Sequence, residues 1–190
     1  MSIKKVFTPI GASNHSVGKR EKNDFYAIDP KAVEGLVKVE SFNNKILEPC
    51  CGAGHISEVL KSHGYIVTSE ELFDRGYGNT GLDFLKREIE WGGDIVTNPP
   101  YKNCLDFIKH SLEIIRLGRK VAMLLRIQFL ESKNRREFFE ESPPIRIHVF
   151  SERILCSKNG EFKPSESKAV CYAWFVWEKG FKGKPELNWI

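Results

Sequence analysis

Short runs of apolar residues alternate with amphipathic stretches along most of the chain, and this alternation is the feature that most constrains its fold. Strand-like runs lie at 45–48, 65–69, 93–98, 120–127, 145–150 and 170–177. Helix-like stretches lie before and between them, at 29–39, 55–64, 103–118 and 133–141. Strands that alternate with helices form βαβ units, in which the strands are parallel and both faces of the sheet are covered. The sequence therefore predicts an α/β fold with a doubly wound, mostly parallel sheet.

The two ends of the chain depart from this alternation. The segment 1–24 is polar, basic and rich in turn-forming residues, so we expect a mobile N-terminal segment. The last two runs, 145–150 and 170–177, are joined by a polar, proline-containing segment without a helix pattern. We therefore expect these two strands to form an antiparallel C-terminal hairpin, and residues 25–190 to form a single domain.

The composition excludes several classes of protein. Hydrophobic residues make up 41% of the 190 residues, which is enough to bury a core, and no apolar run reaches the ~18 residues of a membrane helix. The beginning of the chain lacks the apolar stretch of a secretory signal, so we expect a cytoplasmic protein. The five cysteines are odd in number and lack a CxxC pair, and the five histidines lack HExxH spacing. We therefore expect neither a disulfide framework nor a metal site.

Basic residues are concentrated in the second half of the chain. Residues 98–190 contain 17 lysines and arginines against 11 acidic residues, whereas residues 1–97 contain 12 against 14. Basic charge gathered on one part of a fold suits a polyanionic partner. On charge alone, a solvated basic surface is an equal alternative.

A glycine turn directly follows the first predicted strand and opens a helix. Its sequence is Glu48-Pro49-Cys50-Cys51-Gly52-Ala53-Gly54. The glycines let backbone amides approach a ligand at a helix N-terminus, where negative charge is favoured. The phosphate-binding motif GxGxxG would need a third glycine where Ser57 stands, so the turn suits a carboxylate better than a pyrophosphate.

An acidic residue follows at the distance expected of a group that binds ribose. Glu71, at the end of the second predicted strand, lies 19 residues beyond Gly52. In doubly wound folds, an acid about 20 residues after the glycine turn binds ribose hydroxyls. The two features together predict a ribose-containing cofactor without a pyrophosphate.

The tetrad Asn98-Pro99-Pro100-Tyr101 stands at the carboxyl end of a predicted strand, which is where α/β sheets bind ligands. With this tetrad, the chain from about residue 24 to its C-terminus resembles the S-adenosylmethionine-dependent amino-methyltransferases. The resemblance is closest to the small adenine-N6 DNA methyltransferases of phage and prophage type. It implies a Rossmann-like class I methyltransferase fold and a binding site for S-adenosyl-L-methionine. The residues implied in that site are Phe25, Tyr26, Asp29 and Pro30 of an N-terminal motif, Glu48, Pro49, Cys50, Gly52 and Gly54 of the glycine turn, and Glu71, Asp83, Phe84 and Asn98.

The chemistry of methyl transfer to an amino group explains the tetrad. The lone pair of a base amino nitrogen is delocalised into the ring, so this nitrogen is a poor nucleophile. The Asn98 side-chain oxygen and the Pro99 carbonyl can accept hydrogen bonds from the two N–H groups of this amino nitrogen. Its lone pair then points toward the methyl donor. Pro99 and Pro100 fix the backbone in advance. Tyr101 offers an aromatic face to the base, and stacking of this kind contributes about 1–3 kcal/mol.

The resemblance implies DNA as the substrate, with the target adenine flipped out of the duplex or already single-stranded. The predicted elements use the whole chain, so we expect no separate target-recognition domain and only a weak or short sequence preference. A partner protein could supply further specificity. The basic residues that could hold phosphates are Arg135, Arg136, Lys158, Lys163 and Lys168.

The tetrad leaves other substrates and one non-enzymatic role open. The same four residues could bind RNA adenine, cytosine at N4 or the side-chain amide of a protein glutamine for methylation, since each presents a planar amino group. The first buried strand begins at residue 45, which leaves little room for the N-terminal helical domain of glutamine-modifying relatives. The chain could also be a catalytically silent nucleic-acid-binding module, although Asn98, Tyr101 and Glu71 favour an enzyme.

Overall fold

The computed structural model describes residues 26–158 and 170–190. The segment 1–24 and the candidate site residues Phe25, Lys163 and Lys168 lie outside the described residues. The side chains of Tyr26 and Lys158 are likewise outside the description, although their backbones belong to strands. The elements of the described chain alternate between strands and helices, as the sequence predicts.

The strands and helices have the following bounds. The strands are β1 (Tyr26–Ile28), β2 (Lys45–Glu48), β3 (Ile66–Glu71), β4 (Asn79–Thr80), β5 (Asp94–Thr97), β6 (Lys120–Arg126), β7 (Arg146–Val149), β8 (Cys156–Lys158), β9 (Tyr172–Glu178) and β10 (Glu186–Trp189). The α-helices are α1 (Pro30–Val39), α2 (His55–Ser62), α3 (Cys104–Ile114) and α4 (Lys133–Glu141). Short 3-10 helices are η1 (Phe84–Lys86), η2 (Tyr101–Asn103) and η3 (Ile127–Leu130). None of the helices in the described part of the chain is long and apolar enough to cross a lipid bilayer.

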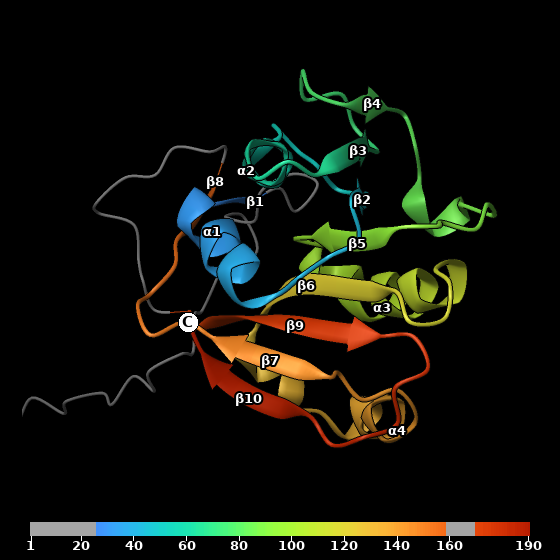
Figure 1. Ribbon diagram of the computed structural model, residues 1–190, viewed down its shortest axis with the longest axis vertical. Helices are drawn as coiled ribbons and strands as arrows, with labels where there is room; N and C mark the ends of the chain where they lie inside the picture. The colour runs from blue at the N-terminus through green and yellow to red at the C-terminus, as the bar shows by residue number, and fades with distance from the viewer. Residues whose placement is uncertain (1–25, 159–169) are drawn as a thin grey trace, which may run out of the picture.

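Eight of these strands form one mostly parallel sheet, in the order β10-β7-β9-β6-β5-β2-β3-β4. β9 is antiparallel to both β6 and β7, whereas the other neighbouring strands are parallel. Helices cover both faces of the sheet, α1 and α2 on one face and α3 and α4 on the other (Figure 1). The predicted doubly wound α/β fold is therefore confirmed.

The strand β6 shows how the sheet divides the core into two parts. Val121, Met123 and Leu125 belong to the apolar cluster that contains α3 and α4. Ala122 and Leu124 belong to the cluster that contains α1 and α2. All five side chains are buried. A strand buried on both faces has an uninterrupted apolar sequence, which is why the run 121–125 predicts β6 clearly.

The C-terminal strands agree with the prediction in their pairing and differ from it in their connection. β7 and β9 are antiparallel, with Ile147 opposite Phe175. The polar segment between them, expected to be a plain loop, contains β8, which pairs antiparallel with β1. No pattern predicted β10, which lies parallel to β7 at the edge of the sheet. Its residues Leu187 and Trp189 are 49% and 70% exposed, so the strand lacks the buried alternation by which strands are recognised.

A buried ion cluster joins the end of α1 to the second half of the sheet. Glu40 is the C-cap of α1 and is only 4% exposed. Its Oε2 accepts hydrogen bonds from Arg146 Nη2 (2.8 Å) and Lys120 Nζ (2.9 Å), and its Oε1 lies 2.9 Å from His148 Nε2. Burial raises the pKa of Glu40, but the hydrogen bonds from Arg146, His148 and Lys120 outweigh it and hold the pKa well below its usual value.

We predict that Glu40→Gln destabilises the fold at pH 7 by about 3–5 kcal/mol, because it leaves buried cations without their counter-charge. The lowered pKa means that the contribution of Glu40 is complete above the unfolded-state value of 4.5 and is lost as the pH falls below it. Urea unfolding from pH 7 down to pH 3 measures this, with the exposed Glu34→Gln on the same helix as the control. If the difference in unfolding free energy between the wild type and Glu40→Gln stays constant over this pH range, the lowered pKa of Glu40 is wrong.

Candidate active site

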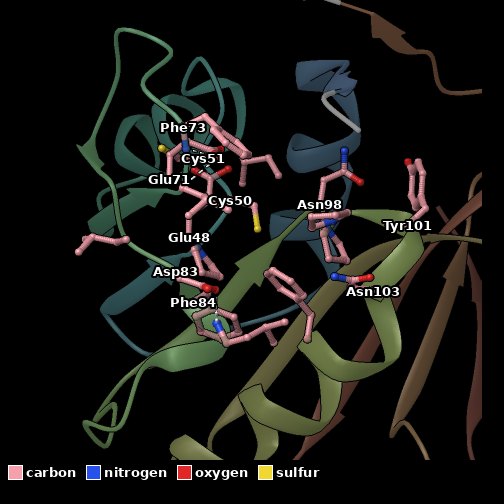
Figure 2. A pocket seen from close by; sticks show the side chains of 18 of the residues that line it. Glu48, Cys50, Cys51, Glu71, Phe73, Asp83, Phe84, Asn98, Tyr101 and Asn103 are labelled. Atoms are coloured by element: carbon pink, nitrogen blue, oxygen red, sulfur yellow. Dashed lines mark hydrogen bonds between the residues drawn. The ribbon is translucent and has the colours of Figure 1, made fainter. Parts of the chain in front are cut away.

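A cavity of about 260 Å³ opens at the carboxyl ends of β2, β3 and β5. These strands are parallel neighbours, so the residues that follow each of them meet at one edge of the sheet. Figure 2 shows Cys50 and Glu71 on one side of the cavity and Asn98 and Tyr101 on the other. The predicted site residues that line it are Glu48, Pro49, Cys50, Glu71, Asp83, Phe84, Asn98, Pro99, Pro100 and Tyr101.

Part of the predicted N-terminal motif lies beside this cavity instead of lining it. Asp29 caps α1, where its Oδ1 accepts a hydrogen bond from the backbone N–H of Lys31 (3.0 Å). Pro30 is the first residue of that helix. Ala27 and Ile28 of β1, which the sequence patterns did not single out, line the cavity in their place. The motif therefore reaches the site through the strand that precedes Asp29.

The two glycines of the turn are not among the residues that line the cavity. Gly52 and Gly54 have left-handed backbone angles, with φ 54° and φ 89°. A Cβ atom on Gly54 would lie 2.6 Å from the ring of Tyr77. The Tyr77 hydroxyl donates to Glu58 Oε1 (2.5 Å) and accepts from Lys61 Nζ (2.7 Å), so α2 holds the ring over the turn. No sequence pattern predicted this role for Tyr77.

Glu71 ties the end of β3 to the glycine turn. It is 8% exposed, and its Oε2 accepts a hydrogen bond from the Gly52 N–H (2.9 Å). Its Oε1 accepts from the next two backbone N–H groups (2.9 and 3.3 Å). A carboxylate has about four acceptor positions, so a hydroxyl donor in the cavity can still be bound. The neighbouring Glu70 is held by Arg87 Nη1 (2.7 and 2.8 Å), so Glu71 is the acid that faces the site.

Glu48 is a buried carboxyl group in the cavity wall. The Ser57 hydroxyl donates to Glu48 Oε2, and Ser57 Oγ lies 2.5 Å from Ser69 Oγ. Burial raises the pKa of Glu48 well above its usual value, and the hydrogen bond from Ser57 opposes this shift only in part. Burial thus favours the neutral acid, which can donate a hydrogen bond. A glycine at position 57 would remove the hydroxyl that satisfies Glu48, which explains the departure from GxGxxG.

The tetrad begins directly after β5, and all four of its residues line the cavity. Asn98 and Tyr101 are both half-buried. The Tyr101 ring lies 6.1 Å from the Tyr172 ring at an interplanar angle of 28°, and 5.0 Å from the guanidinium carbon of Arg126. Its hydroxyl donates to Cys156 Sγ (3.8 Å), and burial raises the pKa of Tyr101 well above its usual value. Side chains from β6, β8 and β9 therefore hold this ring in place.

The structure adds cavity residues that the sequence patterns did not indicate. Phe107 packs against Phe84, with ring centroids 5.2 Å apart. Leu72 and Phe73 directly follow Glu71, so their position after a strand end is a signal that could have found them. The other additions are Cys51, His55, Ile56, Leu82, Leu85 and Asn103.

The candidate phosphate-binding residues in the described chain lie outside the lining of this cavity. Arg135 donates to three backbone carbonyl oxygens (2.8, 2.9 and 3.4 Å), and its guanidinium lies 4.5 Å from the Phe129 ring centre. Arg136 pairs with Glu140 one helical turn along (2.7 Å). Lys158 ends β8, which pairs with the cavity-lining strand β1. A phosphate would therefore compete with the protein itself for Arg135 and Arg136.

Comparison with known proteins identifies the fold. No protein-family model matches the chain, and no curated protein is similar to it. A candidate class I S-adenosylmethionine-dependent methyltransferase from Listeria monocytogenes has a TM-score of 0.59 at 13% identity, over 92% of this chain and 67% of that one. A predicted O-methyltransferase from Agrobacterium tumefaciens has a TM-score of 0.59 at 16% identity, over 85% of each chain.

A third similar structure was solved with its cofactor. Magnesium protoporphyrin IX methyltransferase from Synechocystis PCC 6803, with bound S-adenosylmethionine, has a TM-score of 0.53 at 10% identity. The match covers 80% of this chain and 79% of that one. At these identities the similarity shows a shared fold, the Rossmann-like fold of class I methyltransferases. The named substrates of these proteins differ, so the fold by itself selects none for this chain.

We predict that Gly54→Ala destabilises the protein by about 2–4 kcal/mol, since it combines left-handed backbone strain with overlap against the Tyr77 ring. Gly76→Ala is the matched control, because Gly76 also has a positive φ (79°) but has open space around it. Gly76→Ala should lower the free energy of unfolding only by the backbone strain, about 1–2 kcal/mol. Urea unfolding measures both, and Tyr77→Ala should relieve part of the cost of Gly54→Ala. Equal losses for the two alanine variants would show that Tyr77 does not pack over the turn.

Proposed function

We propose that this chain, which has the class I methyltransferase fold, binds S-adenosyl-L-methionine and transfers a methyl group to the exocyclic N6 of adenine in DNA. One observation carries the proposal: the tetrad opens into the same cavity as Glu71 and the first four residues of the glycine turn, 48–51. The groups suited to the cofactor and the groups suited to an amino substrate therefore share one space.

The residues on the β2 and β3 side suit the parts of the cofactor. Glu71 has acceptor positions left for ribose hydroxyls, and Phe84 offers an apolar ring surface for the adenine. Asp83 precedes that ring, and its Oδ1 accepts from the backbone N–H of Leu85 (3.2 Å), which fixes the turn that presents it. When bound, the cofactor supplies an electrophilic methyl group on its sulfonium, and the protein supplies orientation and electrostatics.

The tetrad supplies the groups that an amino substrate needs. The Asn98 side-chain oxygen and the Pro99 carbonyl accept hydrogen bonds from the two N–H groups of the amino substrate. These bonds favour a tetrahedral nitrogen whose lone pair is directed into the cavity. Pro99 is buried and Pro100 half-buried, so the backbone keeps this shape before the substrate arrives. Tyr101, already held by its neighbours, is the proposed aromatic surface for the base.

Nucleic acid is supported as the substrate class by charge and by the chemistry of the amino group. The half of the chain that contains the tetrad carries 17 basic against 11 acidic residues. An adenine amino group in a duplex is paired and must be flipped out before it can react. The choice of DNA follows the resemblance of the motifs, and a cytoplasmic location is a separate part of this proposal. Because contacts to phosphates carry no sequence information, we propose a weak or short sequence preference, with a partner protein as a source of further specificity.

We predict that Asn98→Ala lowers kcat by at least about 100-fold while the dissociation constant of the cofactor changes less than about threefold, because the lost acceptor acts on the substrate. Calorimetric titration with S-adenosyl-L-methionine and a single-turnover methylation assay measure the two quantities. Asn188→Ala, on the edge strand β10, is the control and should change neither. A loss of cofactor affinity as large as the loss of kcat would assign Asn98 to the cofactor.

The substrate is identified by incubating the protein and methyl-labelled cofactor with equal masses of duplex DNA, single-stranded DNA, RNA and protein extract. We expect the label in N6-methyladenine from DNA. Label in RNA, in N4-methylcytosine or in glutamine would keep the chemistry and replace the substrate. Cofactor binding without any transfer would favour the silent nucleic-acid-binding module. Sequencing of the modified sites tests the weak preference, which a motif of four or more fixed bases would contradict.

A further inference from the structure

Arg126 places a positive charge beside the tetrad. It is the last residue of β6, the strand next to β5. β5 and β6 are parallel, with Thr97 opposite Met123, so Arg126 and the tetrad lie at the same edge of the sheet. The guanidinium carbon of Arg126 lies 5.0 Å from the centre of the Tyr101 ring. Tyr101 and Glu71 lie on opposite sides of the cavity (Figure 2), so Arg126, which contacts the Tyr101 ring, lies on the side of the tetrad.

In the described part of the chain, the guanidinium of Arg126 lacks the carboxylate or carbonyl partners that Arg87 and Arg135 have. Arg87 is bound to both oxygens of Glu70, and Arg135 donates to backbone carbonyl oxygens. Within residues 26–158 and 170–190, Arg126 forms no salt bridge, and its buried Nε atom has no hydrogen-bond partner. A partly buried charge without a counter-ion is costly, so this side chain is poised to receive an anion.

Three described side chains near Arg126, those of Tyr101, Tyr172 and Cys156, do not supply that anion. Tyr172 lies opposite Arg126 in the pairing of β6 with β9. Tyr101 contacts the guanidinium directly, and Cys156 contacts the Tyr101 hydroxyl. Burial raises the pKa of Tyr101 and Tyr172 above the usual value and that of Cys156 to about 11, so all three groups are neutral at pH 7. These neighbours therefore leave the positive charge of Arg126 unbalanced in the described part of the chain, and a bound anionic substrate suits this position.

We propose that Arg126 binds a phosphate of the nucleic-acid strand next to the methylated base. A guanidinium presents paired N–H groups that match two phosphate oxygens, and a flipped nucleotide brings its own flanking phosphates to the site. The inference rests on the proposed function and deepens it. Arg126 is then a positioning residue that favours a polynucleotide over a glutamine amide or a neutral small molecule, neither of which carries an anion.

The test measures methylation of a single-stranded, adenine-containing oligonucleotide by the wild type, Arg126→Met and Arg126→Lys over a range of salt concentrations. Arg116→Met is the matched control, because Arg116 is exposed, pairs with Glu90 and precedes β6 at the opposite edge of the sheet. For Arg126→Met we expect KM to rise about tenfold or more and kcat to stay within about threefold. The slope of log KM against log salt should fall by about 0.7, the loss of one phosphate contact on a single strand.

Other roles of Arg126 would give different results in this experiment. Arg126→Lys keeps the charge, so it should preserve most of the salt slope and recover part of KM, whereas the control should match the wild type. An unchanged salt slope in Arg126→Met would overturn the inference. So would a tenfold loss of S-adenosyl-L-methionine affinity, because Arg126 would then hold the cofactor carboxylate. If Arg126→Met does not fold, Arg126→Gln replaces it with the same expected slope. Absence of transfer to any nucleic acid by the wild type would instead reject the proposed function.

Discussion

Parallel pairing of β2, β3, β5 and β6 is the constraint on which the rest of this structure depends. Parallel strands end at the same edge of a sheet, so the chain segments that leave them are brought together without being close in sequence. The segment after β2 carries the glycine turn, the end of β3 carries Glu71, the segment after β5 is the tetrad, and β6 ends at Arg126. The cavity that the first three of these segments share, with Arg126 beside the tetrad, is a consequence of strand direction.

Hydrogen bonds between these ends then give the site its shape. The Glu71 carboxylate accepts the Gly52 N–H, which joins the end of β3 to the turn after β2. Ser57 satisfies the buried Glu48, and Tyr77 covers Gly54 from outside. Each of these contacts fixes backbone that borders the cavity, so the cofactor side of the site is organised before any ligand is bound. The substrate side depends instead on ring packing around Tyr101 and on the charge of Arg126.

The predictions of secondary structure were correct where burial on one or both faces produces a regular apolar pattern, or where glycines and prolines mark a turn. β6 is buried on both faces and therefore appears as an unbroken apolar run. Glu71 lies beside the glycine turn because the spacing between them reflects the length of one βα unit, and its binding of ribose stays a prediction. The sequence did not predict β1, β8 and β10. β1 and β8 form a separate two-stranded sheet, and β10 is an edge strand of the main sheet. Leu187 and Trp189 of β10 are exposed, so no core selects an alternation there.

The sequence by itself determined the α/β class, the mostly parallel sheet, and the chain positions of the glycine turn, Glu71 and the tetrad. These follow from local patterns, because periodicity and turn chemistry act over a few residues. Only the tertiary structure decided that Tyr77 packs on Gly54, that Arg135 is turned to backbone carbonyls, and that Arg126 faces the tetrad without a carboxylate partner in the described chain. Those contacts join residues that are distant along the chain or lie on different elements, and side-chain packing in three dimensions alone sets their partners.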